Sequence, residues 1–141
     1  MVEVKGSRHV TALSLLRSDS SKYICTTNTG LAYLSASGEV EHLPGGLGEI
    51  IREEEKEAMR FNDAICDSKG RFYFHSMSRD EKKPKGKLYL YDPKSMKSKQ
   101  DLKVLEENFA VGNGPVIDEE RNRFYFNVTP EGVGCARDTV M

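Results

Sequence analysis

The chain has 141 residues, a formal net charge of -1 and a hydrophobic fraction of 38%. This length allows one domain, and the balanced charge argues against a nucleic-acid partner because no basic surface dominates. No apolar run is long enough to cross a membrane, and the N-terminus lacks the apolar segment of a secretory signal. The three cysteines do not make an even disulfide framework, so we expect a reducing, cytoplasmic location.

Residues 1–9 are polar and without hydrophobic periodicity, and we interpret them as an N-terminal arm. Residues 10–141 are predicted to form one incomplete domain. Its first unit consists of short strands between Val10 and Leu43, separated by turns rich in Ser, Asp, Asn and Gly. We expect Cys25, which lies in one of these strands, to be a small buried hydrophobic residue rather than a redox group.

The segment from Glu49 to Met59, EIIREEEKEAM, is the one stretch with helix-forming composition. Its apolar residues do not follow a continuous helical face, so we predict a solvated connection with at most one short helix. An acidic site for a partner is the alternative interpretation of its glutamates.

The second unit begins with a polar cluster of Arg60, Asn62 and Asp63 at the start of a predicted strand. Residues 67–70 predict a tight turn, since Asp and Ser bond their own backbone and Gly tolerates positive φ. The aromatic residues 72–74 then predict a second strand. The cluster therefore lies at the entry of a β-hairpin.

A charged loop at 78–85 follows, which we interpret as a solvated loop or as a rim above the polar cluster. The next strand begins at Gly86. The third unit starts at Val111 and has its own aromatic strand at residues 123–129. Residues 129–141 show no strand alternation, so we predict that this unit has two strands and lacks the outer pair.

The three units repeat one pattern, because Tyr23, Tyr73 and Tyr125 mark equivalent strands about fifty residues apart. This spacing is typical of the four-stranded blades of a β-propeller. The predicted fold class is therefore all-β, a partial β-propeller of about two to three antiparallel blades. Innermost strands of propellers line a common channel, so Asn62 and Asn113, which lie in the first strands of their units, are expected to converge with Arg60.

Several common catalytic motifs are absent from the sequence, including GxSxG, HExxH and paired CxxC. His75 lies within a predicted strand, where we expect a structural role rather than general-base catalysis. Motifs alone therefore leave the catalytic residues unassigned.

The chain resembles one known family over three stretches, RFNDAICDSKGRFYFHSM, GKLYLYD and NGPVIDEERNRFYF. In this order and at these separations they are similar to the middle of the regucalcin, gluconolactonase and luciferin-regenerating-enzyme family, over about residues 10–129. The resemblance implies a six-bladed β-propeller of about twice this length. It also implies a lactonase that opens sugar lactones with a divalent metal (calcium, zinc or magnesium) on the propeller axis.

The same resemblance implies roles for four residues. Asn113 matches a metal ligand, and Arg60 and Asn62 match residues that hold substrate or metal-bound water. Asp80 falls where some members place a glutamate against the sugar. In such a site the cation polarises the lactone carbonyl and lowers the pKa of a bound water, while Arg60 donates hydrogen bonds to the sugar or the developing oxyanion.

Two other ligands of the family's metal site have no counterpart in this sequence, so two functions stay open. The first is a piece or shortened form of a metal-dependent lactonase. The second is a non-catalytic binding protein derived from a β-propeller. In either case two to three blades do not close a ring, and we expect the exposed strand edges to cause self-association.

Overall fold

The computed structural model describes residues 9–16, 19–129 and 135–140, which form three antiparallel sheets. The sheets contain β1 (Ala12–Leu15), β2 (Lys22–Thr26), β3 (Leu31–Ser35) and β4 (Val40–His42); β5 (Met59–Cys66), β6 (Phe72–Ser78), β7 (Gly86–Tyr91) and β8 (Lys103–Phe109); and β9 (Val111–Asp118), β10 (Arg123–Thr129) and β11 (Cys135–Val140). Within each sheet, neighbouring strands follow chain order. Residues 1–8 of the predicted N-terminal arm lie outside the described part.

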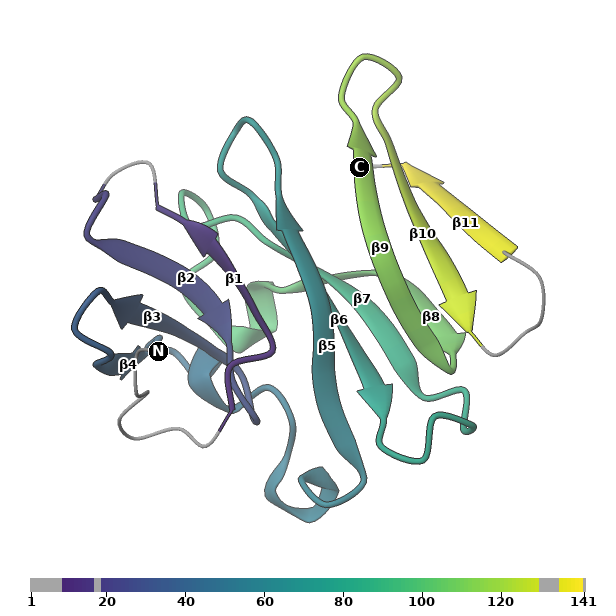
Figure 1. Cartoon of the computed structure of the whole chain (residues 1–141), viewed down its shortest axis with the longest axis horizontal. Helices are drawn as coiled ribbons and strands as arrows, with labels where there is room; N and C mark the ends of the chain where they lie inside the picture. The colour runs from purple at the N-terminus through teal and green to yellow at the C-terminus, as the bar shows by residue number, and fades with distance from the viewer. Residues whose placement is uncertain (1–8, 17–18, 130–134, 141) are drawn as a thin grey trace.

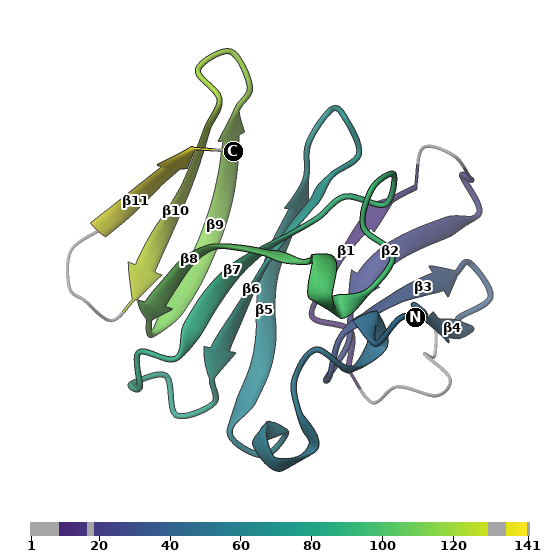
Figure 2. The same ribbon diagram turned by 180° about the vertical axis from the view of Figure 1, so that it is seen from behind.

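The three sheets stand next to one another like the blades of a fan (Figure 1). The first strand of the second blade, β5, contacts β1 of the first blade and β9 of the third. Figure 2 shows the same three blades from behind. The described strands do not close into a ring. This arrangement confirms the prediction of an all-β, partial β-propeller, in which each sheet is one blade.

The prediction of a connection with at most one short helix between Glu49 and Met59 agrees with the structure, in which one three-residue 3-10 helix lies wholly inside this segment. The described residues contain no α-helix but three short 3-10 helices, η1 (Leu47–Glu49), η2 (Glu53–Glu55) and η3 (Lys99–Asp101). Ile50, Ile51 and Met59 are each less than 10% exposed, so isolated apolar anchors fix the connection in place of a helical face. Across the described residues, no helix has the length and apolar character of a membrane span.

The prediction that the third unit has only two strands is wrong, because β11 pairs with β10 from Arg123–Val140 to Val128–Cys135. An edge strand needs only backbone donors and acceptors on one side, so it can form without alternating side chains. The third blade therefore has three strands in the described part of the chain.

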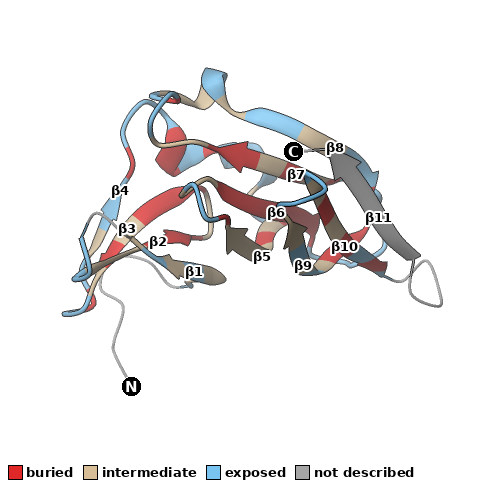
Figure 3. Ribbon diagram, turned by 90° about the horizontal axis from the view of Figure 1, so that it is seen from above, coloured by how far each residue is buried: buried red, intermediate tan, exposed pale blue. Residues whose placement is uncertain are grey.

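The hydrophobic core is centred on β6, whose residues are all buried (Figure 3). Its side chains alternate between two faces. On one face Phe74 stacks on Tyr89 of the same blade, with ring centroids 5.1 Å apart. On the other face Tyr73 stacks on Phe124 of the third blade, with centroids 5.2 Å apart. The aromatic repeat thus joins the second blade to the third.

The predicted turn at residues 67–70 is confirmed. The Asp67 carboxylate accepts hydrogen bonds from the backbone N–H groups of Lys69 and Arg71 and lies 2.5 Å from Nε of Arg71. Gly70 has a φ of 84°, a conformation that favours glycine. Because this carboxylate is buried, its pairing with Arg71 fixes the hairpin that leads into the aromatic strand.

Candidate functional site

A pocket of about 420 Å³ lies where β5 and β9 begin, beneath the loop between β6 and β7. Its lining comprises Arg60, Asn62, Asp80, Glu81, Lys82, Val111, Asn113 and Thr129. All four residues singled out from the sequence are therefore present around one cavity. Their assigned roles in binding substrate or metal stay predictions.

A chain of hydrogen bonds crosses the floor of this pocket from the second blade to the third. Arg60 donates through Nη1 to Oδ1 of Asn62 at 3.0 Å. Asn62 donates through Nδ2 to Oδ1 of Asn113 at 2.7 Å and to the backbone oxygen of Gly112 at 2.9 Å. Asn113 in turn donates to the hydroxyl of Thr129 at 3.1 Å. The structure thus brings Arg60, Asn62 and Asn113 together.

Irregular strand pairing positions these side chains. The β5–β6 register shifts between Phe61 and Ala64, next to Asn62, and such bulges redirect side chains near functional sites. Asp63, within the same bulge, accepts a hydrogen bond from the backbone N–H of Gly114 at 3.0 Å. Gly114 has a φ of 57°, which favours glycine. The two innermost strands are therefore tied together on both sides of the Asn62–Asn113 contact.

Asp80 lines the pocket, but its carboxylate also organises its own loop. Oδ1 accepts hydrogen bonds from the Ser78 hydroxyl at 2.5 Å and from the backbone N–H groups of Lys82 and Lys83 at 3.1 Å each. These bonds, the one from Ser78 foremost, hold the pKa of Asp80 well below its usual range. The carboxylate is thus ionised and fixes the loop above the pocket.

Glu81 adds a second carboxylate from the same loop. Its Oε1 lies 3.8 Å from Nη2 of Arg60, and both side chains are partly exposed, so the ion pair is weak. The hydrogen bond from Nη1 of Arg60 to Asn62 fixes the orientation of the guanidinium. Its other nitrogen, Nη2, faces only the weakly paired Glu81. A ligand with a negative or strongly polar oxygen can compete for that side.

The described residues do not by themselves fit a divalent metal. Asn113 offers one neutral amide oxygen, and this atom already accepts a hydrogen bond from Asn62. The described part of the chain contains no group of three His, Cys, Asp or Glu residues arranged to hold a metal ion. Calcium and magnesium bind through several oxygen ligands, often including carboxylates. Further ligands would be needed to retain an ion at Asn113.

His75 lies behind the pocket, not in it. Its ring is fully buried against Phe109, Phe124 and Phe126, close to Asp63, whose backbone and carboxylate only partly offset the effect of burial on the pKa of His75. Burial lowers its pKa to about 4, so the ring is neutral near pH 7. A Cβ atom on Gly112 would come within 2.6 Å of this ring. His75 therefore shapes the wall behind β9, in agreement with the structural role expected of it.

Sequence reasoning did not single out four residues of the pocket, Glu81, Lys82, Val111 and Thr129. For Glu81 and Lys82 the sequence offers one signal, the charged loop at 78–85, in which the family resemblance assigns a role to Asp80 alone. Val111 and Thr129 are opposite each other in the β9–β10 register. That pairing becomes visible only once the register of the hairpin is known.

Comparisons with known proteins agree with this fold. The sequence model of the SMP-30/Gluconolactonase/LRE-like region matches residues 2–139. The structure of a luciferin-regenerating enzyme is 18% identical with a TM-score of 0.66, over 96% of this chain and 48% of that one. The calcium-binding protein regucalcin from Agrobacterium tumefaciens str. C58 is 18% identical with a TM-score of 0.56, over 93% and 44% of the two chains. This chain therefore spans about half the length of each structure. No curated protein sequence matches it significantly.

Proposed function

Because the chain belongs to the SMP-30/gluconolactonase/LRE-like family, we propose that the pocket at Arg60, Asn62 and Asn113 binds a sugar lactone as part of a metal-dependent lactonase. The proposed activity is that of a complete propeller, since this chain corresponds to 48% of the similar luciferin-regenerating enzyme. The observation that carries the proposal is the hydrogen-bonded chain from Arg60 to Thr129 along the pocket floor.

The chemistry of a sugar lactone suits these groups. Such a molecule has one carbonyl and several hydroxyls, which need both donors and acceptors at fixed positions. The Arg60 guanidinium is held by Asn62 on one side and only loosely paired with Glu81 on the other, so it can donate to the lactone carbonyl. As the ring opens, negative charge grows on that oxygen, and the same donor would stabilise it.

A second candidate is a non-catalytic protein that binds sugars or related polyols. Two observations favour it. The amide oxygen of Asn113 already accepts a hydrogen bond from Asn62, and the Asp80 carboxylate already accepts hydrogen bonds from its own loop. Both arrangements suit binding through fixed polar groups and leave few free ligands for a cation.

Calorimetric titration with gluconolactam, which resists hydrolysis, tests the binding. We expect saturable binding to the chain, weakened about tenfold or more in Arg60→Ala because a charged hydrogen bond is lost. Arg79→Ala is the matched control, since Arg79 lies in the adjacent loop and bonds the backbone oxygen of Lys56. Equal affinity of the wild type and Arg60→Ala would contradict the proposal.

Gluconolactone hydrolysis with added calcium, zinc or magnesium then shows whether this chain is a lactonase by itself. Turnover that disappears in Arg60→Ala would support a lactonase. Lactam binding without turnover would mean that this chain binds the sugar ring but does not hydrolyse it by itself. We expect this result, because the Asn113 oxygen already accepts a hydrogen bond from Asn62 and the proposed activity is that of a complete propeller.

A further inference from the structure

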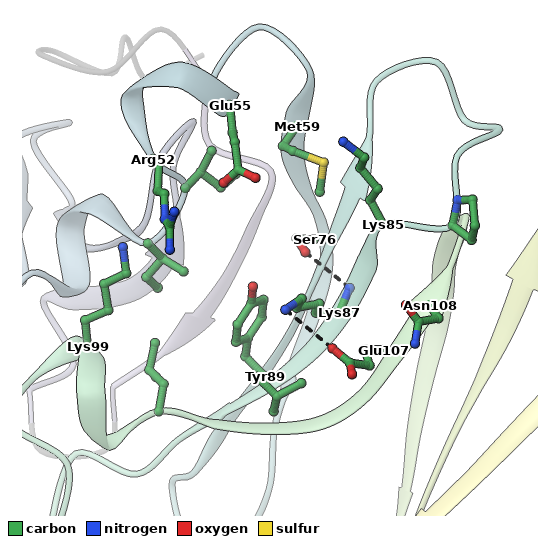
Figure 4. Close-up of a pocket in the computed structure, with 15 residues that line it drawn as sticks. Arg52, Glu55, Met59, Ser76, Lys85, Lys87, Tyr89, Lys99, Glu107 and Asn108 are labelled. Carbon is green, nitrogen blue, oxygen red and sulfur yellow. Dashed lines mark hydrogen bonds and ion pairs between the residues drawn. The ribbon is translucent and has the colours of Figure 1, made fainter.

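A second hollow lies against the outer strands of the second blade, separate from the pocket at Arg60 (Figure 4). Its volume is about 560 Å³, within the range of small-molecule sites. The walls come from the connection before β5, from β7 and β8, and from the loop that precedes β8. We call it the outer groove. It has no lining residue in common with the first pocket and is complete within the second blade and its connection.

Part of the floor of the outer groove is apolar, and this part is firmly held. Tyr89 points its hydroxyl toward the middle of the groove, while its ring stacks on the buried Phe74 at 5.1 Å (Figure 4). Ile50 and Ile51 are nearly buried along the wall, and Val104 is 46% exposed. A flat apolar body could therefore cover Val104 and the edge of Tyr89 without disturbing the core.

Charged side chains border this apolar floor. They are the basic residues Arg52, Lys85, Lys87 and Lys99 and the carboxylates Glu55 and Glu107. Lys87 pairs with Glu107 at 3.4 Å. Lys99 donates to the backbone oxygen of Glu49 at 2.8 Å, which joins η3 to the connection. These bonds fix two of the basic groups in place.

The other two basic groups have little to neutralise them. Lys85 makes no side-chain hydrogen bond or ion pair with the residues that the structure describes. Arg52 has only a contact of 3.9 Å with Glu54, and both side chains are about 70% exposed, so that pair contributes little. Among the lining residues, four basic groups stand against the two carboxylates of Glu55 and Glu107, and Glu54 lies beside Arg52 just outside the lining, so the excess of positive charge is greatest at Lys85.

We propose that the outer groove binds a small organic anion, one carboxylate or phosphate group carried on an aromatic or similarly apolar body. The apolar body would cover Tyr89 and Val104, and the anionic group would lie toward Lys85. Arg52, which Figure 4 shows on the other side of Glu55, adds positive charge at the border of the groove. Guanidinium and ammonium groups both bind such oxyanions through charge-assisted hydrogen bonds. Glu55 limits the charge that the groove tolerates, since a second anionic group would meet its carboxylate.

An NMR titration of the isotope-labelled chain with naphthyl phosphate tests this site. We expect saturable shifts of amide resonances at Lys85, Lys87, Tyr89 and Val104, with resonances around Asn62 unchanged. Naphthol and inorganic phosphate each carry half of the ligand's chemistry, so each should bind at least about tenfold more weakly. Inorganic phosphate that binds as tightly as naphthyl phosphate would overturn the proposal, and so would shifts located elsewhere.

Variants then assign the contacts. Arg52→Ala/Lys85→Ala should weaken binding of naphthyl phosphate about tenfold or more, through the loss of two positive charges. Lys94→Ala/Lys103→Ala removes the same charge from exposed positions outside the groove and should bind like the wild type. Val104→Glu tests the floor independently, since this exposed residue can change without opening the core, and it should also abolish tight binding. Equal affinities in all three variants would overturn the proposal.

Discussion

Asn62 and Asn113, 51 residues apart in the sequence, face each other across two blades, with Nδ2 of the first 2.7 Å from Oδ1 of the second. Each lies in the first strand of its blade, next to a shift in strand register. The contact therefore links the candidate binding site to the packing between blades. A change at either residue should alter both binding and stability.

We predict that Asn62→Ala destabilises the chain by about 1 to 2 kcal/mol, because it removes the donor to the Gly112 backbone and to Asn113 in a partly buried place. Urea unfolding measures the free energy of unfolding of both proteins. Gln100→Ala is the control, since it removes an exposed amide. Equal losses in the two variants would show that the contact between blades adds nothing.

The buried His75 predicts a dependence of stability on pH. Its pKa of about 4 in the fold is lower than its ordinary value of 6.5, so the unfolded chain binds more protons between these values. The free energy of unfolding should therefore be highest above pH 6.5 and should fall as the pH decreases toward 4. His75 contributes up to about 3 kcal/mol to this fall.

The measurement is urea unfolding at several pH values across that window for the wild type and His75→Phe. The variant keeps an aromatic ring among the phenylalanines but has no titrating group, so its stability should change less with pH. His42→Gln, which removes an exposed histidine, should keep the wild-type dependence. A His75→Phe curve parallel to that of the wild type would refute this explanation.

Asp80 predicts a local effect on the loop between β6 and β7. Without its carboxylate, the hydroxyl of Ser78 and the backbone N–H groups of Lys82 and Lys83 lose their acceptor. Asp80→Ala should therefore open the loop, and limited digestion with trypsin should cleave faster after Lys82. Glu57→Ala removes an exposed carboxylate elsewhere and should be cleaved at the wild-type rate. No difference between Asp80→Ala and the wild type would mean that the loop is held by other contacts.

The sequence predicted the blades because aromatic strands at Tyr23, Tyr73 and Tyr125 carry a strong local signal that repeats. It also predicted that Asn62 and Asn113 would meet, since the first strands of adjacent blades must be neighbours in a propeller. Both inferences depend on strand order and repeat spacing. These are properties that a sequence displays directly.

Other features depend on contacts between distant segments and were missed. β11 forms by backbone pairing with β10, which leaves no alternation in the sequence. The connection before Met59 has at most the short helix expected of it, but the burial of Ile50 and Ile51 in the core depends on contacts that its composition does not show. The bonds of Asp80 to its own loop require the path of that loop, including the positive φ of Glu81.

Exposed apolar residues on the innermost strands lead us to expect self-association. Leu13 and Leu15 of β1 are each 54% exposed, and Val116 of β9 is 58% exposed. In sedimentation velocity the chain should be larger than a monomer, and Leu13→Lys/Leu15→Lys should shift it toward the monomer. Val104→Lys changes an exposed residue on an outer strand and should have no such effect. A wild-type chain that sediments only as a monomer would contradict this expectation.

The binding of a sugar lactone between the second and third blades is tested most directly by a crystal structure of the chain with gluconolactam. We predict that the lactam occupies the pocket of about 420 Å³, with its carbonyl oxygen within hydrogen-bond distance of Arg60 and its hydroxyls against Asn62 and Asn113. Lactam bound only elsewhere, with the hydrogen bonds from Arg60 to Asn113 intact and the pocket empty at saturating concentration, would contradict the proposed site.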